Sequence, residues 1–309
     1  MSTRVALKWT SFWVALGLAF SGIIYWGYEY DWIPGGEKHT GLEAVVLYLT
    51  GYLVEESLSV DNIFVIALLI GYFKVPAAYQ HRLLYYGILG ALVFRGVLIV
   101  AGALLIQRFE WLIYVFGALL LYSAYKMWRS GDEEVNPANN PTVKLIKKYI
   151  PLTRHYDEGH FFVKRRHITA ATPMFVALMA IETTDILFAF DSIPAIFGIT
   201  TDPFLVFSSN VFALLGLRSL YFVLATALDK FHYLKHSLVF ILAFVGLKMI
   251  GEHYVHLPSW ASLAVVIASL ATGIGLSLLI PAKADNEQPP QRPEEKEKEV
   301  AENGHPAVK

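Results

Sequence analysis

The sequence predicts an all-α integral membrane protein with about eight transmembrane helices, and three observations lead to this prediction. Of its 309 residues, 55% are hydrophobic and 17% are charged, and the mean hydropathy is +0.47. Apolar runs close to the length that crosses a bilayer recur along the chain. Lysine and arginine gather in alternate loops between these runs, which is the charge bias of a multi-pass membrane protein. These features are not those of a soluble globular domain.

Composition also excludes several classes of chemistry. The chain contains no cysteine, so it has no disulfide framework, no thiolate metal site and no cysteine nucleophile. Its 25 basic and 26 acidic residues give a net charge of -1, and this balance predicts no binding of nucleic acid. The expected surroundings are the lipid bilayer, and any metal must be held by oxygen or imidazole ligands.

Eight apolar runs are expected to form the spans. They cover residues 11–28, 44–73, 83–106, 112–127, 174–199, 204–228, 237–250 and 261–280. The first run ends in Trp26 and Tyr28 without the small residues of a signal-peptide cleavage site, so we interpret it as a retained span. The fourth and seventh runs are short, and the flanking aromatic residues Trp111, Trp128 and Tyr254 extend them into the membrane interfaces.

Basic residues are segregated by loop. Twenty of the 25 lysines and arginines lie in the N-terminus, the second, fourth and sixth loops and the tail. The opposite side holds only Lys38 and Arg108, and Arg95, Arg218 and Lys248 lie inside spans. Because cytoplasmic loops are enriched in lysine and arginine, both termini are expected in the cytoplasm.

Two polar segments complete the domain plan. Residues 1–281 are expected to form the transmembrane domain, which contains a basic cytoplasmic loop at 129–172. We interpret this loop as a solvated linker, and an alternative interpretation places residues 144–150 on the membrane surface as an amphipathic segment. Residues 282–309 are rich in Glu, Lys, Pro and Gln and poor in apolar side chains, so they are predicted to form a disordered cytoplasmic tail.

Similar short motifs occur in the same order in spans two to four and in spans five to seven. This pattern predicts that residues 40–128 and residues 173–256 are two copies of one structural repeat. The matching marks are Glu55 with Asp185, Asp61-Asn62-Ile63 with Asp191-Ser192-Ile193, Arg95 with Arg218, and Lys126-Met127 with Lys248-Met249. Each unit has three spans, an odd number, so the second unit must enter the membrane from the opposite face. Inverted repeats with interrupted helices are a common plan of secondary transporters, whose site lies near mid-membrane.

Acidic side chains inside two spans are the most informative feature. They are Glu55, Glu56 and Asp61 in span two, and Glu182, Asp185 and Asp191 in span five. An aspartate near the middle of a span costs about 2.5 to 3.5 kcal/mol, so six acids there are expected to be functional. The three basic residues inside spans can pair with only half of them, and the remaining charge requires protons or bound cations. Arg95 and Arg218 are expected to hold carboxylates in supporting ion pairs.

A straight helix would not bring these acids together. At about 100° per residue, Glu55 and Asp61 point about 120° apart, and so do Asp185 and Asp191. Pro194 lacks an N–H group, and the serines of span two can bond to the local backbone, so we expect interrupted helices at the acidic motifs. An interruption would let the carboxylates converge and would expose carbonyl oxygens.

Converging carboxylates, the amide of Asn62 and the hydroxyl groups of Ser59 or Ser192 would form an anionic, all-oxygen site. Such a site suits Mg2+, Ca2+ or Mn2+, because these hard cations prefer carboxylate and carbonyl oxygens. The ten histidines lie in loops or near span ends, and none is assigned as a ligand.

Two stretches resemble the signature segments of the TerC/Alx integral membrane family, which is related to LysE-type transporters. They run from Glu55 to Val65 (EESLSVDNIFV) and from Glu182 to Ala195 (ETTDILFAFDSIPA), and the resemblance covers about residues 40–281. It implies a protein of the bacterial cytoplasmic (inner) membrane that exports manganese or, in some members, supplies manganese to exported enzymes. Carried over by motif position, the implied metal ligands are Glu55, Asp61, Asn62, Glu182, Asp185 and Asp191, with Glu56, Ser59 and Ser192 as additional candidates.

The favoured hypothesis is a secondary transporter that exports Mn2+ in exchange for protons, because carboxylates can carry either ion. No enzymatic activity and no prosthetic group are expected. The choice of Mn2+ over Mg2+ or Ca2+ follows from the resemblance alone. The family takes its name from tellurium resistance, but direct tellurite transport is disfavoured because a carboxylate cluster repels an oxyanion.

Two alternatives belong to other classes of protein. A membrane metallochaperone or interaction protein would supply Mn2+ to exported proteins, with an unidentified partner bound at the basic loop. An intramembrane aspartyl protease would need paired aspartates, but Asp191 stands in a Phe-Asp-Ser sequence rather than in the glycine-flanked motif of that class.

Overall fold

Long helices form almost all of the described chain. The structure, a computed structural model, describes residues 3–33, 39–129, 143, 151–153, 156, 159–165, 168–224, 233–251, 254 and 257–279, without the side chains of residues 3, 4, 61, 165, 168, 218 and 224. Its helices are α1 (Thr3–Glu29), α2 (Gly41–Tyr72), α3 (Ala77–Arg108), α4 (Leu112–Arg129), α6 (Pro173–Phe197), α7 (Pro203–Leu224), α8 (Leu234–Gly251) and α9 (Ser259–Leu279). Each apolar run of the sequence coincides with one of these helices.

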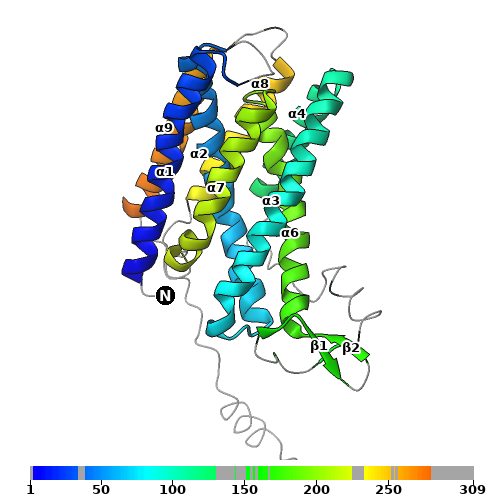
Figure 1. The fold of residues 1–309 in the computed structure, drawn as a ribbon. Coiled ribbons are helices and arrows are strands. Elements are labelled where there is room, and N and C mark those ends of the chain that lie inside the picture. The colour runs from blue at the N-terminus through cyan, green and yellow to red at the C-terminus, as the bar shows by residue number, and fades with distance from the viewer. Residues whose placement is uncertain are drawn as a thin grey trace, which may run out of the picture.

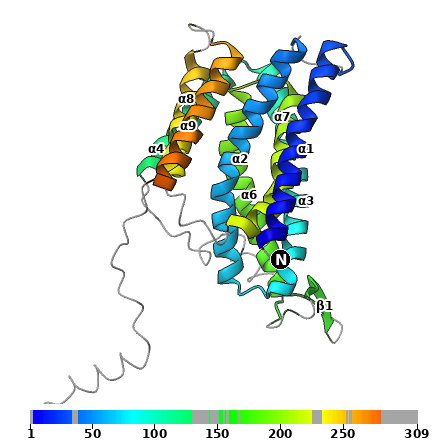
Figure 2. The same ribbon diagram turned by 90° about the vertical axis from the view of Figure 1, so that its left-hand side faces the viewer.

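The helices alternate in direction along the bundle (Figure 1). The N-terminus and the two strands that precede α6 lie at the same end of the bundle in both views (Figures 1 and 2). Consequently α2 and α6 run antiparallel, as do α3 and α7, and α4 and α8. The two members of each of these pairs are in contact, and α7 also packs against α1 and α2.

Six of the described helices are long and apolar enough to cross a membrane. They are α1 from Val5 onward, α3, α6, α7 as far as Val223, α8 and α9. The other two are α2, which carries acids in its middle, and α4, which has 18 residues and ends in Lys126 and Arg129. The chain is therefore an all-α membrane protein, and the number of eight spans stays a prediction.

Small residues let the helices of the bundle approach closely. A Cβ atom at Gly246 of α8 would lie 3.0 Å from the carbonyl oxygen of Gly117 in α4. This close backbone approach of two helices is typical of glycine positions in membrane proteins. Around it lies an apolar core that includes Leu120, Ile196 and Val245.

Asp202 ties α1 to the start of α7. Its side chain is 1% exposed, and its Oδ1 accepts hydrogen bonds from the backbone N–H groups of Phe204 at 2.9 Å and Leu205 at 3.3 Å. Its Oδ2 accepts a hydrogen bond from the Tyr28 hydroxyl at 2.7 Å. An aspartate before Pro203 is a favourable helix start, because it satisfies free N–H groups while proline needs none.

The predicted interruption of the acidic helices is wrong for the described backbone. Helix α2 is continuous over its 32 residues, and α6 is continuous over 25 residues that include Pro194. Ser57 donates to the carbonyl of Leu53 within the same helix, so its hydroxyl is satisfied without a break. Pro194 lies in the last turn of α6. The loss of its N–H donor therefore removes one hydrogen bond near the end of the helix and leaves the rest of the helix intact.

Two short strands lie within the predicted basic loop, directly before α6. Strands β1 (Phe162–Arg165) and β2 (Ile168–Ala171) pair antiparallel. The Tyr156 hydroxyl donates to the carbonyl of Phe73 at the end of α2, and the Arg82 guanidinium lies 5.6 Å from the ring centre of Phe161. Burial raises the pKa of Tyr156, so this donor keeps its proton. Residues 144–150 and the tail at 282–309 lie outside the described residues.

Candidate metal-binding site

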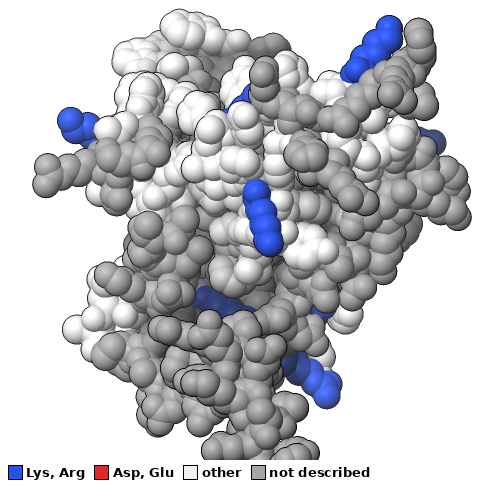
Figure 3. All heavy atoms as spheres, turned by 90° about the horizontal axis from the view of Figure 1, so that it is seen from below, with Lys and Arg blue, Asp and Glu red and all other residues white. Residues whose placement is uncertain are grey.

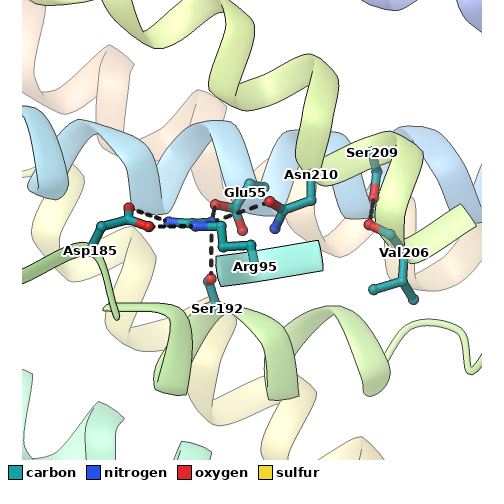
Figure 4. Close-up of polar contacts among 7 residues, drawn as sticks. All are labelled: Glu55, Arg95, Asp185, Ser192, Val206, Ser209 and Asn210. Atoms are coloured by element: carbon teal, nitrogen blue, oxygen red, sulfur yellow. Dashed lines mark hydrogen bonds and ion pairs between the residues drawn. The ribbon is translucent and has the colours of Figure 1, made fainter. Parts of the chain in front are cut away.

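Arg95 of α3 lies at the centre of a buried charged cluster (Figure 4). Its side chain is 1% exposed. Its Nη2 and Nε donate to the two carboxylate oxygens of Asp185 at 3.0 and 3.1 Å, and its Nη1 donates to Oε1 of Glu55. The same Nη1 lies 3.3 Å from the Ser192 hydroxyl and 3.5 Å from Oδ1 of Asn210. Arg95 therefore forms buried ion pairs with Glu55 and Asp185.

Four helices contribute to this cluster. Glu55 comes from α2, Arg95 from α3, Asp185 and Ser192 from α6, and Asn210 from α7. The sequence interpretation did not include Asn210. An amide inside an apolar span is a detectable signal, because such side chains usually form hydrogen bonds between helices.

Each acidic helix presents oxygen-bearing side chains on one face. Glu55 and Ser59 are one turn apart on α2, Asn62 follows within the next turn, and the three are 0%, 0% and 3% exposed. On α6, Asp185 and Ser192 are seven residues apart and therefore also share a face. Two polar stripes thus run along α2 and α6, and Arg95 contacts both.

Several buried polar atoms on α2, α6 and α7 have no hydrogen-bond partner. Among the described side chains, they include Oε2 of Glu55, Oε2 of Glu56, Oγ of Ser59, Nδ2 of Asn62, Oε2 of Glu182 and Nδ2 of Asn210. Each unpartnered buried group costs about 1 to 3 kcal/mol, more for a charged group. Buried polar groups without partners are rare in native proteins, and a bound ion is one way to satisfy them.

Asp191 points away from the Arg95 cluster. Its Oδ1 accepts a hydrogen bond of 2.5 Å from the Ser123 hydroxyl on α4. The separation follows from the continuous helix, which turns Asp191 about 120° from Asp185. The side chains of Asp61 and Arg218, which are also predicted site residues, lie outside the described part of the chain.

Residues 40–285 match the integral membrane protein TerC family, which is most of the chain and includes every residue of the cluster. The chain belongs to the TerC family. The resemblance inferred from the two acidic segments is therefore confirmed.

Curated TerC relatives come from bacteria and from a plant. The uncharacterized membrane protein STKORF319 of Myxococcus xanthus is 44% identical over 276 residues, which are 89% of this chain and 83% of that protein. Alx of Escherichia coli K12, whose name describes a membrane-bound redox modulator, is 43% identical over 87% of this chain and 83% of its own length. The chloroplastic thylakoid membrane protein TERC of Arabidopsis thaliana is 47% identical over 75% of this chain and 60% of its own length. No solved structure is significantly similar to the chain.

In this TerC protein, Gly90 of α3 provides the space for the Glu182 carboxylate. A Cβ atom at Gly90 would overlap with both carboxylate oxygens of Glu182. Glu182 is 6% exposed. Glu56 of α2 is partly buried, and its Oε1 lies 3.7 Å from the position that a Cβ atom would take at Gly216 in α7. The acids of the TerC motifs therefore face different neighbours.

We expect Gly90→Ala to displace the Glu182 carboxylate and to lower the free energy of unfolding by about 1 to 3 kcal/mol, the usual effect of overpacking. Gly22→Ala is the matched control, because a Cβ atom there meets nothing within 4 Å. Glycine-to-alanine changes inside helices otherwise stabilise by about 0.5 to 1 kcal/mol. Thermal unfolding of the purified protein in detergent measures both effects. Equal unfolding midpoints for the two variants would contradict the position of Glu182.

The predicted metal ligands of this TerC protein are not assembled around one point in the described residues. Within that part of the chain, no group of three or more histidine, aspartate or glutamate side chains could hold a metal ion. The physical reason is visible at the cluster, where Arg95 lies between Glu55 and Asp185. The metal site stays a prediction.

Proposed function

We propose that this TerC-family protein is a secondary transporter that exports a divalent cation, Mn2+ in preference, in exchange for protons. The main support is the position of Glu55 and Asp185. These carboxylates come from the two acidic helices, are 0% and 13% exposed, and both bind Arg95 inside the bundle. Buried ionisable groups of membrane proteins mark ion pathways.

The ligand types support a hard divalent cation. The polar stripes of α2 and α6 offer carboxylate, amide and hydroxyl oxygens, and the chain has no cysteine. Oxygen ligands accommodate Mn2+, Mg2+ and Ca2+. The preference for Mn2+ rests on the resemblance to the TerC family. Because carboxylates bind either a metal ion or protons, competition between the two couples export to proton entry.

Transport also requires a movement that opens the site to each side of the membrane in turn, and two inverted repeats would provide it. The repeats are residues 40–128 and 173–256, and the proposal is supported by the antiparallel contacts of α2 with α6, α3 with α7, and α4 with α8. Arg95 belongs to the first repeat and contacts Asp185 in the second. Rocking of one repeat against the other would open the site to each side of the membrane in turn.

The basic end of the bundle is proposed to face the cytoplasm. Seen from the end that holds β1 and β2, the described surface has lysine and arginine side chains and shows no aspartate or glutamate (Figure 3). The N-terminus lies at this same end. By the positive-inside rule, we propose that the N-terminus is in the cytoplasm of a bacterium and that the chain spans the inner membrane eight times.

The name of the Alx relative suggests redox modulation, and a transporter would explain such an effect without redox chemistry of its own. This chain contains no cysteine, so a dithiol centre is excluded here. By changing the cytoplasmic concentration of Mn2+, the transporter would affect other proteins that use this metal.

Transport is tested with the purified protein in liposomes. We expect Mn2+ flux with opposite movement of protons, measured with a Mn2+-quenched dye and a pH dye inside the vesicles. Asp61→Asn and Asp191→Asn are each expected to reduce the flux at least about tenfold, because each removes a charge inside a span. Asp31→Asn is the control, since Asp31 is exposed and has a φ of 52°, which asparagine also adopts.

Unchanged flux in both Asp61→Asn and Asp191→Asn would defeat the assignment of these residues. Flux of Mn2+ without a change of internal pH would defeat the exchange with protons. Absence of Mn2+ flux in the unmodified protein would defeat the transport function.

A further inference from the structure

Arg95 uses most of the oxygens that a metal ion would need. It binds both carboxylate oxygens of Asp185 and one of the two carboxylate oxygens of Glu55. The Ser192 hydroxyl and the Asn210 carbonyl also lie within 3.5 Å of its Nη1. In this conformation, the guanidinium therefore occupies the position between the two acids that a bound cation would take.

A metal ion and the guanidinium cannot share this position. A hard divalent cation takes six or more oxygen ligands at about 2 to 2.6 Å, and Arg95 holds three of the four carboxylate oxygens of Glu55 and Asp185. Two cations at ion-pair distance also repel each other strongly where the surroundings are dry. Binding of a metal therefore requires the guanidinium to leave the two acids.

We propose that Arg95 is a tethered counter-ion that occupies the cation site when no metal is bound and leaves it when the metal enters. This inference rests on the proposed transport function and assigns Arg95 a specific role in it. The exchange of one cation for the other is the event that links metal binding to a rearrangement of the helices. Because α3 carries the guanidinium and α6 carries Asp185, release of this ion pair removes a buried charged contact between the two repeats.

Two buried atoms distinguish this cluster from an ion pair that only holds helices together. Oε2 of Glu55 and Nδ2 of Asn210 have no hydrogen-bond partner, although both side chains are at most 1% exposed. A purely structural pair is expected to satisfy its buried polar groups, because each unsatisfied group is costly. Oε2 of Glu55 is therefore a buried carboxylate oxygen that Arg95 leaves available to a cation.

The experiment measures Mn2+ binding to the purified full-length protein, with free Mn2+ followed by its electron paramagnetic resonance signal. We expect Arg95→Gln to bind Mn2+ about tenfold more tightly or better, because removal of a competing state raises the apparent affinity. Arg95→Lys keeps a charge without the planar fork, and its affinity is expected to lie between those of Arg95→Gln and the unmodified protein. Arg108→Gln, at the end of α3, is expected to bind like the unmodified protein.

A second measurement separates a tethered counter-ion from a structural pair. In liposomes, Arg95→Gln is expected to transport Mn2+ more slowly than the unmodified protein although it binds the ion more tightly, since nothing replaces the ion on release. Circular dichroism and gel filtration establish that the variant is folded. If Arg95→Gln does not fold, Arg95→Lys decides the question by the same comparison of affinities.

Equal or weaker Mn2+ binding by the folded variant would overturn the role of Arg95. The proposed transport function would then stand on the flux of the unmodified protein. If neither the unmodified protein nor the variants bind or transport Mn2+, both proposals are overturned.

Discussion

Asp185→Ala is expected to abolish Mn2+ transport and to lower the free energy of unfolding by about 3 to 5 kcal/mol, the usual effect of removing one partner from a buried ion pair. The variant removes both hydrogen-bond acceptors from Nε and Nη2 of Arg95. The guanidinium, 1% exposed, then keeps Glu55 as its only described acidic partner. Denaturant titration in detergent measures the stability, and the liposome assay measures the flux.

A triple variant tests whether the loss comes from an unpaired charge. Asp185→Ala combined with Arg95→Met and Glu55→Leu is expected to recover much of the stability, because apolar groups then replace all three charged members of the buried cluster. Mn2+ transport stays absent in the triple variant, since both carboxylates of the proposed site are removed. Glu43→Ala is the control: this residue is 44% exposed beside His39 and is expected to contribute at most about 1 kcal/mol. A loss in Asp185→Ala no larger than in Glu43→Ala would contradict the buried pair.

Asp202→Ala is expected to lower the free energy of unfolding by about 3 kcal/mol. The substitution leaves two N–H groups at the start of α7 and the Tyr28 hydroxyl without their acceptor. Loss of a helix cap costs about 0.5 to 2 kcal/mol, and an unsatisfied buried donor costs about 1 to 3 kcal/mol. Thermal unfolding in detergent measures the effect.

Tyr28→Phe separates the two contributions of Asp202. It removes only the hydrogen bond between helices, so we expect a loss of about 1 kcal/mol and an intact cap. An equal loss in Tyr28→Phe and Asp202→Ala would show that the cap contributes nothing. No loss in either variant would contradict the connection between α1 and α7.

The helices of this protein were predictable from the sequence because apolar run length is a local property. The run at 44–73 became α2, and that at 174–199 became α6, with boundaries that differ by three residues or fewer. The sequence analysis predicted an interruption of α6 near Pro194, and this prediction was wrong because the helix is continuous there. A proline near a helix end removes one hydrogen bond, and the rest of α6 is held by its own backbone and by packing against α2 and α3.

The candidate site was predictable in part. Glu55, Asn62 and Glu182 were identified from their place in apolar spans, and all three are buried in the structure. The divergence of Asp191 toward Ser123 follows from the helical rotation of about 120° that a break would have removed. Asn210 was missed because it lies outside the acidic motifs, and nothing local to α7 indicates a partner on α3.

Composition and the length of the apolar runs were enough to predict that this chain lies in a bilayer and carries acids in two of its helices, because both properties depend on neighbouring residues. Only the tertiary structure showed that Arg95 of the same chain forms ion pairs with two of those acids. Arg95 and Asp185 are 90 residues apart. Their contact depends on how α3 and α6 are rotated and placed against each other, which no single segment of sequence specifies.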